Sequence, residues 1–305
     1  EIYTGRIVGS VDVYKRQGSI VAIVTPMKSD YSVDFHSLKK LFLFHEEAKT
    51  DGIVLIGTTG EAGTLSISER EDIYKFACDN TAIPLMAGVG SSSTSDSLKF
   101  IDLALNCGIE KCLAVTPYYN KPSQEGLIAH FKKLASSDAL IYLYNVPGRT
   151  GVDLQPESVD ELLGENNIVG IKEAINTHDR MEKLSKLLEK RKDFYLLSGD
   201  DPSFVEFGKY GAVGIISVAA NIVPEVIKQI SDLIQEKNFE EAALISKKYE
   251  KLFNILLENS PGPSKYLLAK IKMLENNLRL PLVKISEKLG NCLLYTSPSP
   301  RDFTE

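Results

Sequence analysis

Lys172 stands directly after the apolar run Ile168–Ile171, where a charged side chain is costly. Burial disfavours an ammonium group, so a lysine that closes a buried strand has a lowered pKa and can hold a neutral amine. A neutral amine attacks a ketone to form a Schiff base, and this is the chemistry that the position predicts. Two other arrangements fit the same segment: Lys172 extends to the rim of the fold, or it pairs with Glu173.

Polar residues follow several other apolar runs. Gly57–Glu61 (GTTGE) places two hydroxyl groups between glycines, and such a turn can direct backbone N–H groups at a small anion. Thr116–Asn120 and Tyr144–Gly151 carry tyrosines, which at strand ends either pack the rim of a fold or exchange protons. Each segment by itself is explained by a plain turn or by packing at the rim. A functional role requires that the fold bring these segments together.

Ser198–Asp201 ends another apolar run with two acids, whose charges would repel a phosphate. Two carboxylates can hold Mg²⁺, but no further acid or histidine cluster completes an octahedral site, and Asp201 precedes Pro202 as an expected helix cap. The four histidines fall in helix-like segments without ligand spacing: His36, His45, His130 and His178. We therefore expect no metal site.

Short apolar runs alternate with amphipathic stretches between Gly18 and Leu289. Eight runs rich in Val, Ile and Leu predict strands buried on both faces: Ser19–Thr25, Gly52–Ile56, Pro84–Gly88, Lys111–Thr116, Leu140–Tyr144, Ile168–Lys172, Phe194–Ser198 and Val213–Val218. Seven stretches between them predict helices: Phe35–Ala48, Ser68–Asn80, Thr94–Asn106, Ser123–Ser136, Pro156–Leu163, Thr177–Lys190 and Pro202–Tyr210. Ser66 and Thr177 are expected helix caps. The even count and regular repeat favour a (β/α)8 TIM barrel over a long doubly wound sheet, and barrel enzymes place their chemistry at the carboxyl ends of the strands.

After Val218 only helix-like segments follow: Val223–Gln235, Phe239–Glu258, Ser264–Asn276 and Pro281–Leu289. This pattern predicts a catalytic barrel over 18–220 and a C-terminal helical region over 221–289. Residues 1–17 and 290–305 keep neither period and resemble translated adapter or vector sequence. We expect both ends to be extraneous or disordered, with native disordered tails as the alternative. The amino end does not have the charged start and apolar run of a signal peptide.

The composition excludes several classes of protein. The 35 basic and 41 acidic residues give a net charge of −6, and no basic stripe offers itself to nucleic acid. The longest apolar runs are too short to span a bilayer. The cysteines form no CxxC pair and lie in apolar segments, which predicts reduced, buried thiols and a cytoplasmic location: Cys78, Cys107, Cys112 and Cys292.

Five motifs in order resemble the dihydrodipicolinate synthase family: GTTGE (57–61), VTPYYNKPSQEG (115–126), YNVPGRTG (144–151), GIKEA (170–174) and LLSGDD (196–201). The likeness runs from Ser19 to about Leu289. It implies the same barrel with carboxy-terminal helices, assembled as a homotetramer from two tight dimers. It also implies the condensation of pyruvate with L-aspartate 4-semialdehyde to 4-hydroxy-tetrahydrodipicolinate, the first committed step toward diaminopimelate and lysine.

The resemblance implies the catalytic roles. Lys172 would form the Schiff base with pyruvate, with no other cofactor. Tyr144, across the barrel mouth from Lys172, would be the general acid and base. Thr58 and Tyr119 would complete a hydroxyl relay, with Tyr119 reaching over from the partner subunit.

The resemblance also implies the substrate-binding residues. Thr59 and the backbone donors of the 57–60 turn would hold the pyruvate carboxylate, and Ile216 would contact pyruvate through its backbone. Gly199 would bind substrate as well. Arg149 would grip the carboxylate of the semialdehyde with its planar guanidinium fork.

Other pyruvate-dependent class I aldolases, such as N-acetylneuraminate lyases and sugar-acid aldolases, share the lysine, the tyrosine and a GTTGE-like turn. They are expected to lack an arginine after the YNVP stretch, so Arg149 argues against them. A non-catalytic barrel that serves as a binding protein is a second alternative, and the presence of Lys172 and Tyr144 argues against it.

The resemblance bears on regulation too. In lysine-inhibited members the effector lies at the tight-dimer interface, near the positions of Ala62, Gly63, Ile67, Arg70, Ser92, Asp96 and Tyr118. The sensitive pattern has histidine at the position of Arg70, asparagine at that of Ser92 and glutamate at that of Asp96. Arg70 places a fixed positive charge where a cationic effector docks, so we expect weak inhibition by L-lysine or none.

Overall fold

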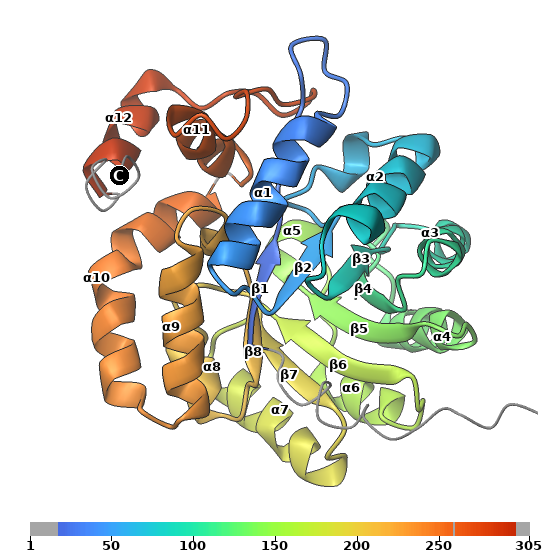
Figure 1. Cartoon of the computed structure of the whole chain (residues 1–305). Helices are drawn as coiled ribbons and strands as arrows, with labels where there is room; N and C mark the ends of the chain where they lie inside the picture. Colours follow the sequence, from blue (N-terminus) through green and yellow to red (C-terminus); the bar gives the residue numbers. More distant parts are fainter. Residues whose placement is uncertain (1–17, 259, 297–305) are drawn as a thin grey trace, which may run out of the picture.

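A computed structural model describes residues 18–258 and 260–296, which form a closed barrel of eight parallel strands surrounded by helices (Figure 1). The strands are β1 Gly18–Ala22, β2 Gly52–Leu55, β3 Leu85–Gly88, β4 Lys111–Val115, β5 Leu140–Asn145, β6 Ile168–Glu173, β7 Tyr195–Ser198 and β8 Gly214–Ser217. The helices between them are α1 Phe35–Glu47, α2 Ile67–Asn80, α3 Thr94–Asn106, α4 Gln124–Ala135, α5 Pro147–Thr150, α6 Pro156–Leu162, α7 His178–Lys190 and α8 Phe204–Lys209. The predicted (β/α)8 barrel is confirmed.

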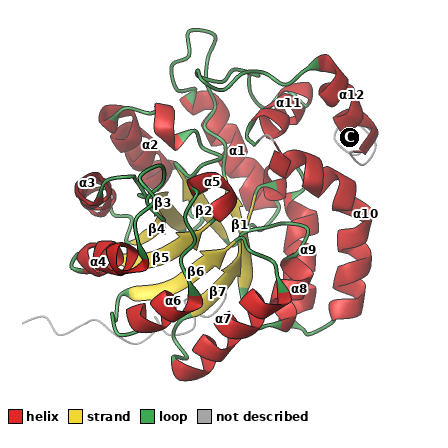
Figure 2. Cartoon of the chain, turned by 180° about the vertical axis from the view of Figure 1, so that it is seen from behind, coloured by secondary structure: helices red, strands yellow, loops and turns green. Residues whose placement is uncertain are grey.

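Each strand pairs with its sequence neighbours, and β8 closes the ring by pairing with β1. Seen from behind, the strands form a core enclosed by helices (Figure 2). Successive strand residues point alternately into the barrel and toward the helices. The barrel interior is filled by a separate apolar cluster: Ile20, Ala22, Val54, Met86, Leu113, Tyr142, Tyr144, Leu197 and Ile216. The larger core lies between the strands and the helices.

The two expected helix caps differ in outcome. Ser66 forms a capping box with Glu69 at the start of α2: the Ser66 hydroxyl accepts from the Glu69 N–H, and the Glu69 carboxylate accepts from the Ser66 N–H. Thr177 stands at the N-cap position of α7, but its side chain makes no capping hydrogen bond.

The carboxy-terminal region contains α9 Pro224–Gln235, α10 Phe239–Glu258, α11 Gly262–Lys270 and α12 Glu287–Thr296. Helices α9 and α10 lie side by side against the barrel (Figure 1). The short 3-10 turn Ala219–Asn221 joins this region to the barrel. The Asn221 amide accepts from the Val24 N–H at 3.1 Å and donates to the Ala22 carbonyl at 2.9 Å, so the chain leaves the barrel firmly bonded to β1.

The predicted bounds of two helices in this region are wrong at both ends. Instead of Ser264–Asn276, α11 begins at Gly262 because Pro263 suits the first turn of a helix, and it ends at Lys270 just before Lys272 takes a left-handed φ of 60°. Instead of Pro281–Leu289, the last helix begins at Glu287, where the Ser286 hydroxyl accepts from the Leu289 N–H.

The expectation that 290–305 lie outside the fold is wrong for residues 290–296. Helix α12 runs through them and packs on α10 and α11, and Leu293 is fully buried. Gly290 lies against Tyr266 so closely that a Cβ there would fall 2.6 Å from the ring. The remainder of this prediction, on 1–17 and 297–305, concerns residues outside the described ranges.

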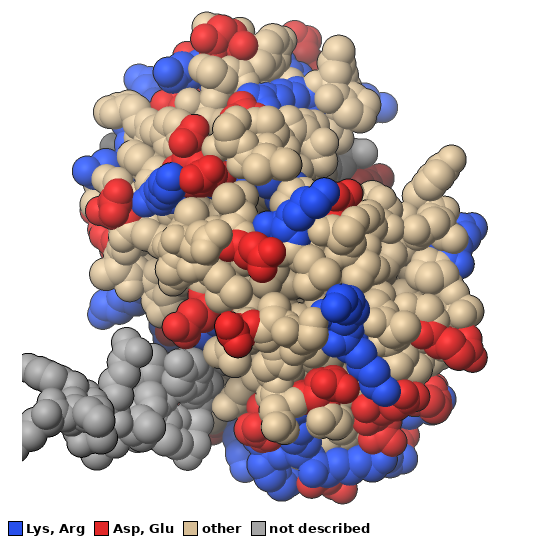
Figure 3. All heavy atoms as spheres, turned by 90° about the vertical axis from the view of Figure 1, so that its right-hand side faces the viewer, with Lys and Arg blue, Asp and Glu red and all other residues tan. Residues whose placement is uncertain are grey.

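All four cysteines are free thiols, as predicted. The predicted burial is correct for Cys112 and wrong for the others, because Cys78 and Cys292 are exposed and Cys107 is half-buried. Within the described ranges, no helix is long and apolar enough to cross a bilayer. On the face shown in Figure 3, basic and acidic side chains are interspersed rather than gathered into a basic stripe.

Candidate active site

Lys172 and Tyr144 form the centre of the candidate site. They are register partners on the neighbouring strands β6 and β5, and both point into the barrel near the carboxyl ends of the strands. The Lys172 Nζ lies 4.2 Å from the centroid of the Tyr144 ring. Tyr144 is therefore beside Lys172, and the expectation that it lies across the barrel mouth is wrong, because the residues end adjacent strands.

Burial governs the charge of Lys172. The side chain is 5% exposed, and desolvation lowers its pKa to about 7, helped by the positive charge of Arg149 and opposed by Asp201 and Asp200. Across residues 18–258 and 260–296, no carboxylate forms an ion pair with Lys172. Glu173 points to the other side of β6, so the structure rejects both a rim lysine and a Lys172–Glu173 pair. A large share of Lys172 is neutral at pH 7.

The Tyr144 hydroxyl is a proton donor at neutral pH. Desolvation raises the pKa of this buried phenol to about 12, although Arg149 acts to lower it. The ring can therefore donate a proton to an oxygen bound at Lys172. Acting as a base requires a path that returns the proton, which the hydroxyl groups nearby would have to supply.

Gly199 and Ile216 line the space beside the lysine. Gly199 follows β7, and a Cβ at this position would fall 3.1 Å from the Lys172 Cε and 3.0 Å from the Glu173 carbonyl oxygen. Only glycine leaves room for the lysine stem there. Ile216 on β8 is 1% exposed and belongs to the barrel interior together with Tyr144.

The 57–61 turn follows β2. The N–H groups of Gly60, Glu61 and Ala62 donate to carbonyls within the turn itself. Within the described residues, this leaves the N–H groups of Gly57, Thr58 and Thr59 for an anion, a smaller set of donors than expected from the sequence. Thr59 is buried, whereas Thr58 is exposed and makes no hydrogen bond to Tyr144 in the part of the chain described here.

Glu61 and Lys265 hold this turn in place. Neither residue was singled out from the sequence. They form an ion pair in which both side chains are 0% exposed. Lys265 also donates to the Asn277 carbonyl at 2.8 Å, and Glu61 accepts from the Arg279 N–H at 3.0 Å. Lys265 directly precedes the apolar stretch Tyr266–Ala269, and this is the one sequence signal that could have drawn attention to it.

Arg149 lies on α5, the short helix that follows β5, with its side chain exposed. Its charge acts on the pKa values of both Lys172 and Tyr144, which places it near the barrel mouth. Its guanidinium donates to the Leu257 carbonyl at 3.4 Å, a long hydrogen bond that leaves the rest of the fork open to a ligand.

Tyr119 does not join the other candidates within its own chain. It is 92% exposed, with a left-handed φ of 75°, on the loop after β4. A tyrosine standing this far out into solvent cannot line its own barrel mouth.

Asp201 is not the helix cap expected from Pro202. It is buried at the end of β7 and accepts from the Ser217 hydroxyl and from the N–H groups of Val218 and Ala219. It therefore ties β7 to the turn after β8, because those N–H groups have no strand partner beyond β8. Among the described residues, no group of three histidine, cysteine or acidic side chains is arranged to hold a metal ion.

Comparisons with known proteins show the family that this chain resembles. Residues 15–293 match the model of the dihydrodipicolinate synthetase family. The 4-hydroxy-tetrahydrodipicolinate synthase of Saccharophagus degradans is 43% identical over 277 residues, covering 89% of this chain and 94% of that protein. The synthase of a Shewanella species is 44% identical over 284 residues, covering 91% and 95%.

A solved structure shows the same architecture. The chloride-inhibited dihydrodipicolinate synthase of Acinetobacter baumannii, complexed with pyruvate, superimposes with a TM-score of 0.87 at 40% identity. The match covers 92% of this chain and 97% of that one.

Proposed function

The chain belongs to the dihydrodipicolinate synthetase family, and we propose that the reaction it catalyses, the condensation of pyruvate with L-aspartate 4-semialdehyde, proceeds through a Schiff base on Lys172. The observation that carries this mechanism is a fully enclosed lysine, with its pKa lowered to about 7, beside a buried tyrosine at the carboxyl ends of the barrel strands. The bound pyruvate of the related Acinetobacter baumannii structure fits this view.

The first half of the reaction prepares pyruvate as a nucleophile. The neutral Lys172 amine adds to the keto carbon, and loss of water leaves a protonated imine. Thr59, with the N–H groups of Thr58 and Thr59, holds the pyruvate carboxylate, and Ile216 and Gly199 shape the pocket. The cationic imine withdraws electrons, so the methyl group loses a proton and an enamine forms.

Tyr144 carries the protons of both halves. Its hydroxyl donates to the departing oxygen and receives a proton back through Thr58 and Tyr119. Because Tyr119 is exposed in its own chain, it enters the relay from a partner copy, which makes a tight dimer part of the site. Two such dimers form the homotetramer, in the cytoplasm and without any cofactor beyond the covalent pyruvate.

The second half joins the carbon chains. The enamine carbon attacks the aldehyde carbon of the semialdehyde, the aldehyde oxygen takes a proton from Tyr144, and the amino group of the semialdehyde closes the ring by displacing Lys172 from the imine. Arg149 orients this substrate through its carboxylate, since a guanidinium fork matches two carboxylate oxygens. The arginine favours this reaction over that of another pyruvate-dependent aldolase.

A covalent trap tests the mechanism. Pyruvate with cyanoborohydride should leave one reduced adduct, found by mass spectrometry on Lys172, and Lys172→Ala should abolish it. An adduct on another lysine would refute the proposal.

A panel of aldehydes tests the second substrate. The purified protein should consume aspartate semialdehyde in the presence of pyruvate far faster than N-acetylmannosamine. The Arg149→Ala variant should lose semialdehyde turnover and keep the pyruvate adduct. If the protein instead consumes N-acetylmannosamine faster than aspartate semialdehyde, it belongs to the alternative class of aldolases.

A further inference from the structure

The residues next to the catalytic pair meet on the opposite face of the same strands. Asn145 and Glu173 directly follow Tyr144 and Lys172, and they are register partners in the same way. Because side chains alternate along a strand, they point away from the barrel interior and toward the helices. The Asn145 Nδ2 donates to both Glu173 carboxylate oxygens at 3.1 Å, and both residues are fully buried.

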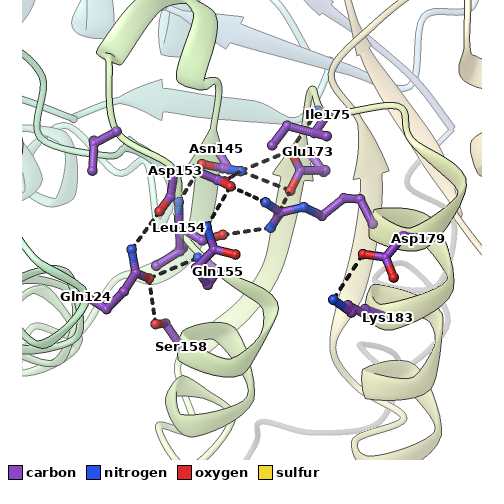
Figure 4. A network of polar contacts seen from close by, with 12 residues as sticks. Gln124, Asn145, Asp153, Leu154, Gln155, Ser158, Glu173, Ile175, Asp179 and Lys183 are labelled. Atoms are coloured by element: carbon purple, nitrogen blue, oxygen red, sulfur yellow. Dashed lines mark hydrogen bonds and ion pairs between the residues drawn. The ribbon is translucent and has the colours of Figure 1, made fainter.

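Arg180 and Asp153 extend this pair into a network (Figure 4). Arg180, in the first turn of α7, forms an ion pair with Asp153, and its Nη1 lies 3.7 Å from the Glu173 Oε2. The same Nη1 donates to the Leu154 carbonyl at 2.9 Å. The Asp153 Oδ1 accepts from the Asn145 Nδ2 at 2.8 Å. The buried Glu173 carboxylate and the half-buried Asp153 carboxylate therefore both join Asn145 at the end of β5 to Arg180 of α7.

This network closes a loop that carries Arg149. The chain leaves β5 at Asn145, forms α5, and returns at Leu154, whose N–H donates to the Asn145 Oδ1 at 2.9 Å. Gln124 of α4 fastens the return from the other side, since its Nε2 donates to the Asp153 carbonyl at 2.7 Å. Hydrogen bonds to the same network therefore hold both ends of the 146–152 segment.

Arg149 itself contributes little to its own placement. In the described ranges its side chain makes one hydrogen bond, the 3.4 Å contact with the Leu257 carbonyl. The position of its guanidinium, close enough for its charge to lower the pKa of Lys172, therefore depends on where the ends of the 146–152 segment are held.

We infer that Asp153 and Arg180 are positioning residues that set the place of Arg149, and through it the recognition of the second substrate's carboxylate. This inference rests on the proposed function, because it concerns the semialdehyde step of that reaction. The two residues touch neither substrate, and Lys172 keeps its place on β6 without them. Their loss should therefore damage the second half of the reaction and spare the first.

The Asp153→Asn variant tests the positioning role of Asp153 most directly. Both Asp153 oxygens accept hydrogen bonds, Oδ1 from Asn145 and Oδ2 from Arg180 and from the Gln155 Nε2. The introduced amide has the same shape, but one of its two hydrogen-bond acceptors is replaced by a donor. The hydrogen bond to either Asn145 or Arg180 is therefore lost. Arg180 keeps Glu173 and the Leu154 carbonyl as partners, so the fold should survive.

The experiment measures each substrate separately. Asp153→Asn should raise the KM for semialdehyde about tenfold, the loss of one charge-assisted hydrogen bond. The KM for pyruvate and the rate of the cyanoborohydride adduct on Lys172 should stay within about twofold. Arg180→Lys, which keeps the charge and loses the fork, should follow the same pattern. Asp160→Asn is the matched control, because Asp160 pairs with Lys190 at 2.6 Å on α6 and α7 without touching the pinned segment.

A double variant shows whether Asp153 acts through Arg149. In the Arg149→Ala background, Asp153→Asn should add no further loss of semialdehyde turnover, since the group that it positions is gone. Additive losses, equal damage to the pyruvate adduct, or an unchanged semialdehyde KM would overturn the inference. If the wild-type protein fails to consume semialdehyde at all, the proposed function falls instead.

Discussion

At the scale of single residues, the site depends on two neighbouring positions that face opposite ways. Lys172 points into an apolar interior where none of the described carboxylates forms an ion pair with it, and burial disfavours its charge. Glu173 points outward to Asn145 and Arg180, which satisfy a carboxylate that would otherwise be buried alone. Because successive side chains of β6 point to opposite faces, the reactive amine of Lys172 is kept away from the Glu173 carboxylate, which would otherwise form an ion pair with it.

This environment predicts the pH dependence of Schiff-base formation. The neutral amine is the reactive form, and the pKa of Lys172 is lowered to about 7, so the neutral fraction grows as pH rises through 7. Adduct formation with pyruvate and cyanoborohydride should increase by about tenfold from pH 6 to pH 8 and then level off. A lysine with an ordinary pKa would instead keep gaining rate up to about pH 10. Initial rates by mass spectrometry across this range distinguish the two profiles.

At the scale of elements, the periodic parts of the chain were predictable and the long-range polar contacts were not. Apolar runs place all eight strands, because burial on both faces leaves a continuous signal in the sequence. Lys172, Tyr144 and Ile216 could be placed for the same reason, since each belongs to a strand. Glu61 and Lys265 are 204 residues apart, and nothing periodic connects them. The same holds for Asp153 and Arg180, whose pairing depends on how α7 packs against a loop.

The Glu61–Lys265 pair predicts a strong coupling between α11 and the turn after β2. Lys265→Met leaves the Glu61 carboxylate buried without its partner, which should lower the free energy of unfolding by about 3–5 kcal/mol. The double variant Glu61→Gln with Lys265→Met should recover much of that loss. Lys75→Met is the control, because its pair with Glu71 is exposed to solvent and should contribute little to stability. Urea denaturation measures all three, and a small effect of Lys265→Met would contradict the coupling.

Helix α12 should contribute to stability through one buried side chain. Leu293 is fully buried between α10 and α11, so Leu293→Ala should cost about 2 kcal/mol or more. Lys288→Ala, on an exposed position of the same helix, should stay within about 0.5 kcal/mol. Equal melting temperatures for both variants would return residues 290–296 to the extraneous segment that their sequence suggests.

At the scale of the whole molecule, the proposed proton relay requires a second copy of the chain. Its barrel supplies Lys172, Tyr144 and the 57–61 turn, whereas Tyr119 stands in solvent. A tight dimer that inserts this tyrosine would both finish the relay and cover an exposed aromatic side chain. An effector bound at this proposed interface would lie close to both copies of the site.

The expectation of weak or no inhibition by L-lysine rests on the charge of Arg70. The buried guanidinium donates to the Ala62 carbonyl at 2.5 Å and lies 4.1 Å from the centroid of the Phe100 ring, so it cannot swing away from an incoming ligand. Two unit charges about 6 Å apart at an effective dielectric constant of about 20 repel by nearly 3 kcal/mol. Asp96, the acid that could offset this repulsion, already pairs with Lys99 at 3.0 Å.

We therefore expect millimolar L-lysine to leave the rate of condensation almost unchanged. Arg70→His should gain sensitivity, because a histidine is mostly neutral at pH 8 and removes the repulsion. Rates measured with 0 to 10 mM L-lysine, at saturating pyruvate and semialdehyde, test both proteins. An inhibition constant below about a millimolar for the wild type would contradict this prediction. It would mean that Asp96 releases Lys99 to bind the ammonium group of the effector, and that the charge of Arg70 is screened at the interface. That affinity would correspond to more than about 4 kcal/mol of binding free energy gained in spite of the repulsion.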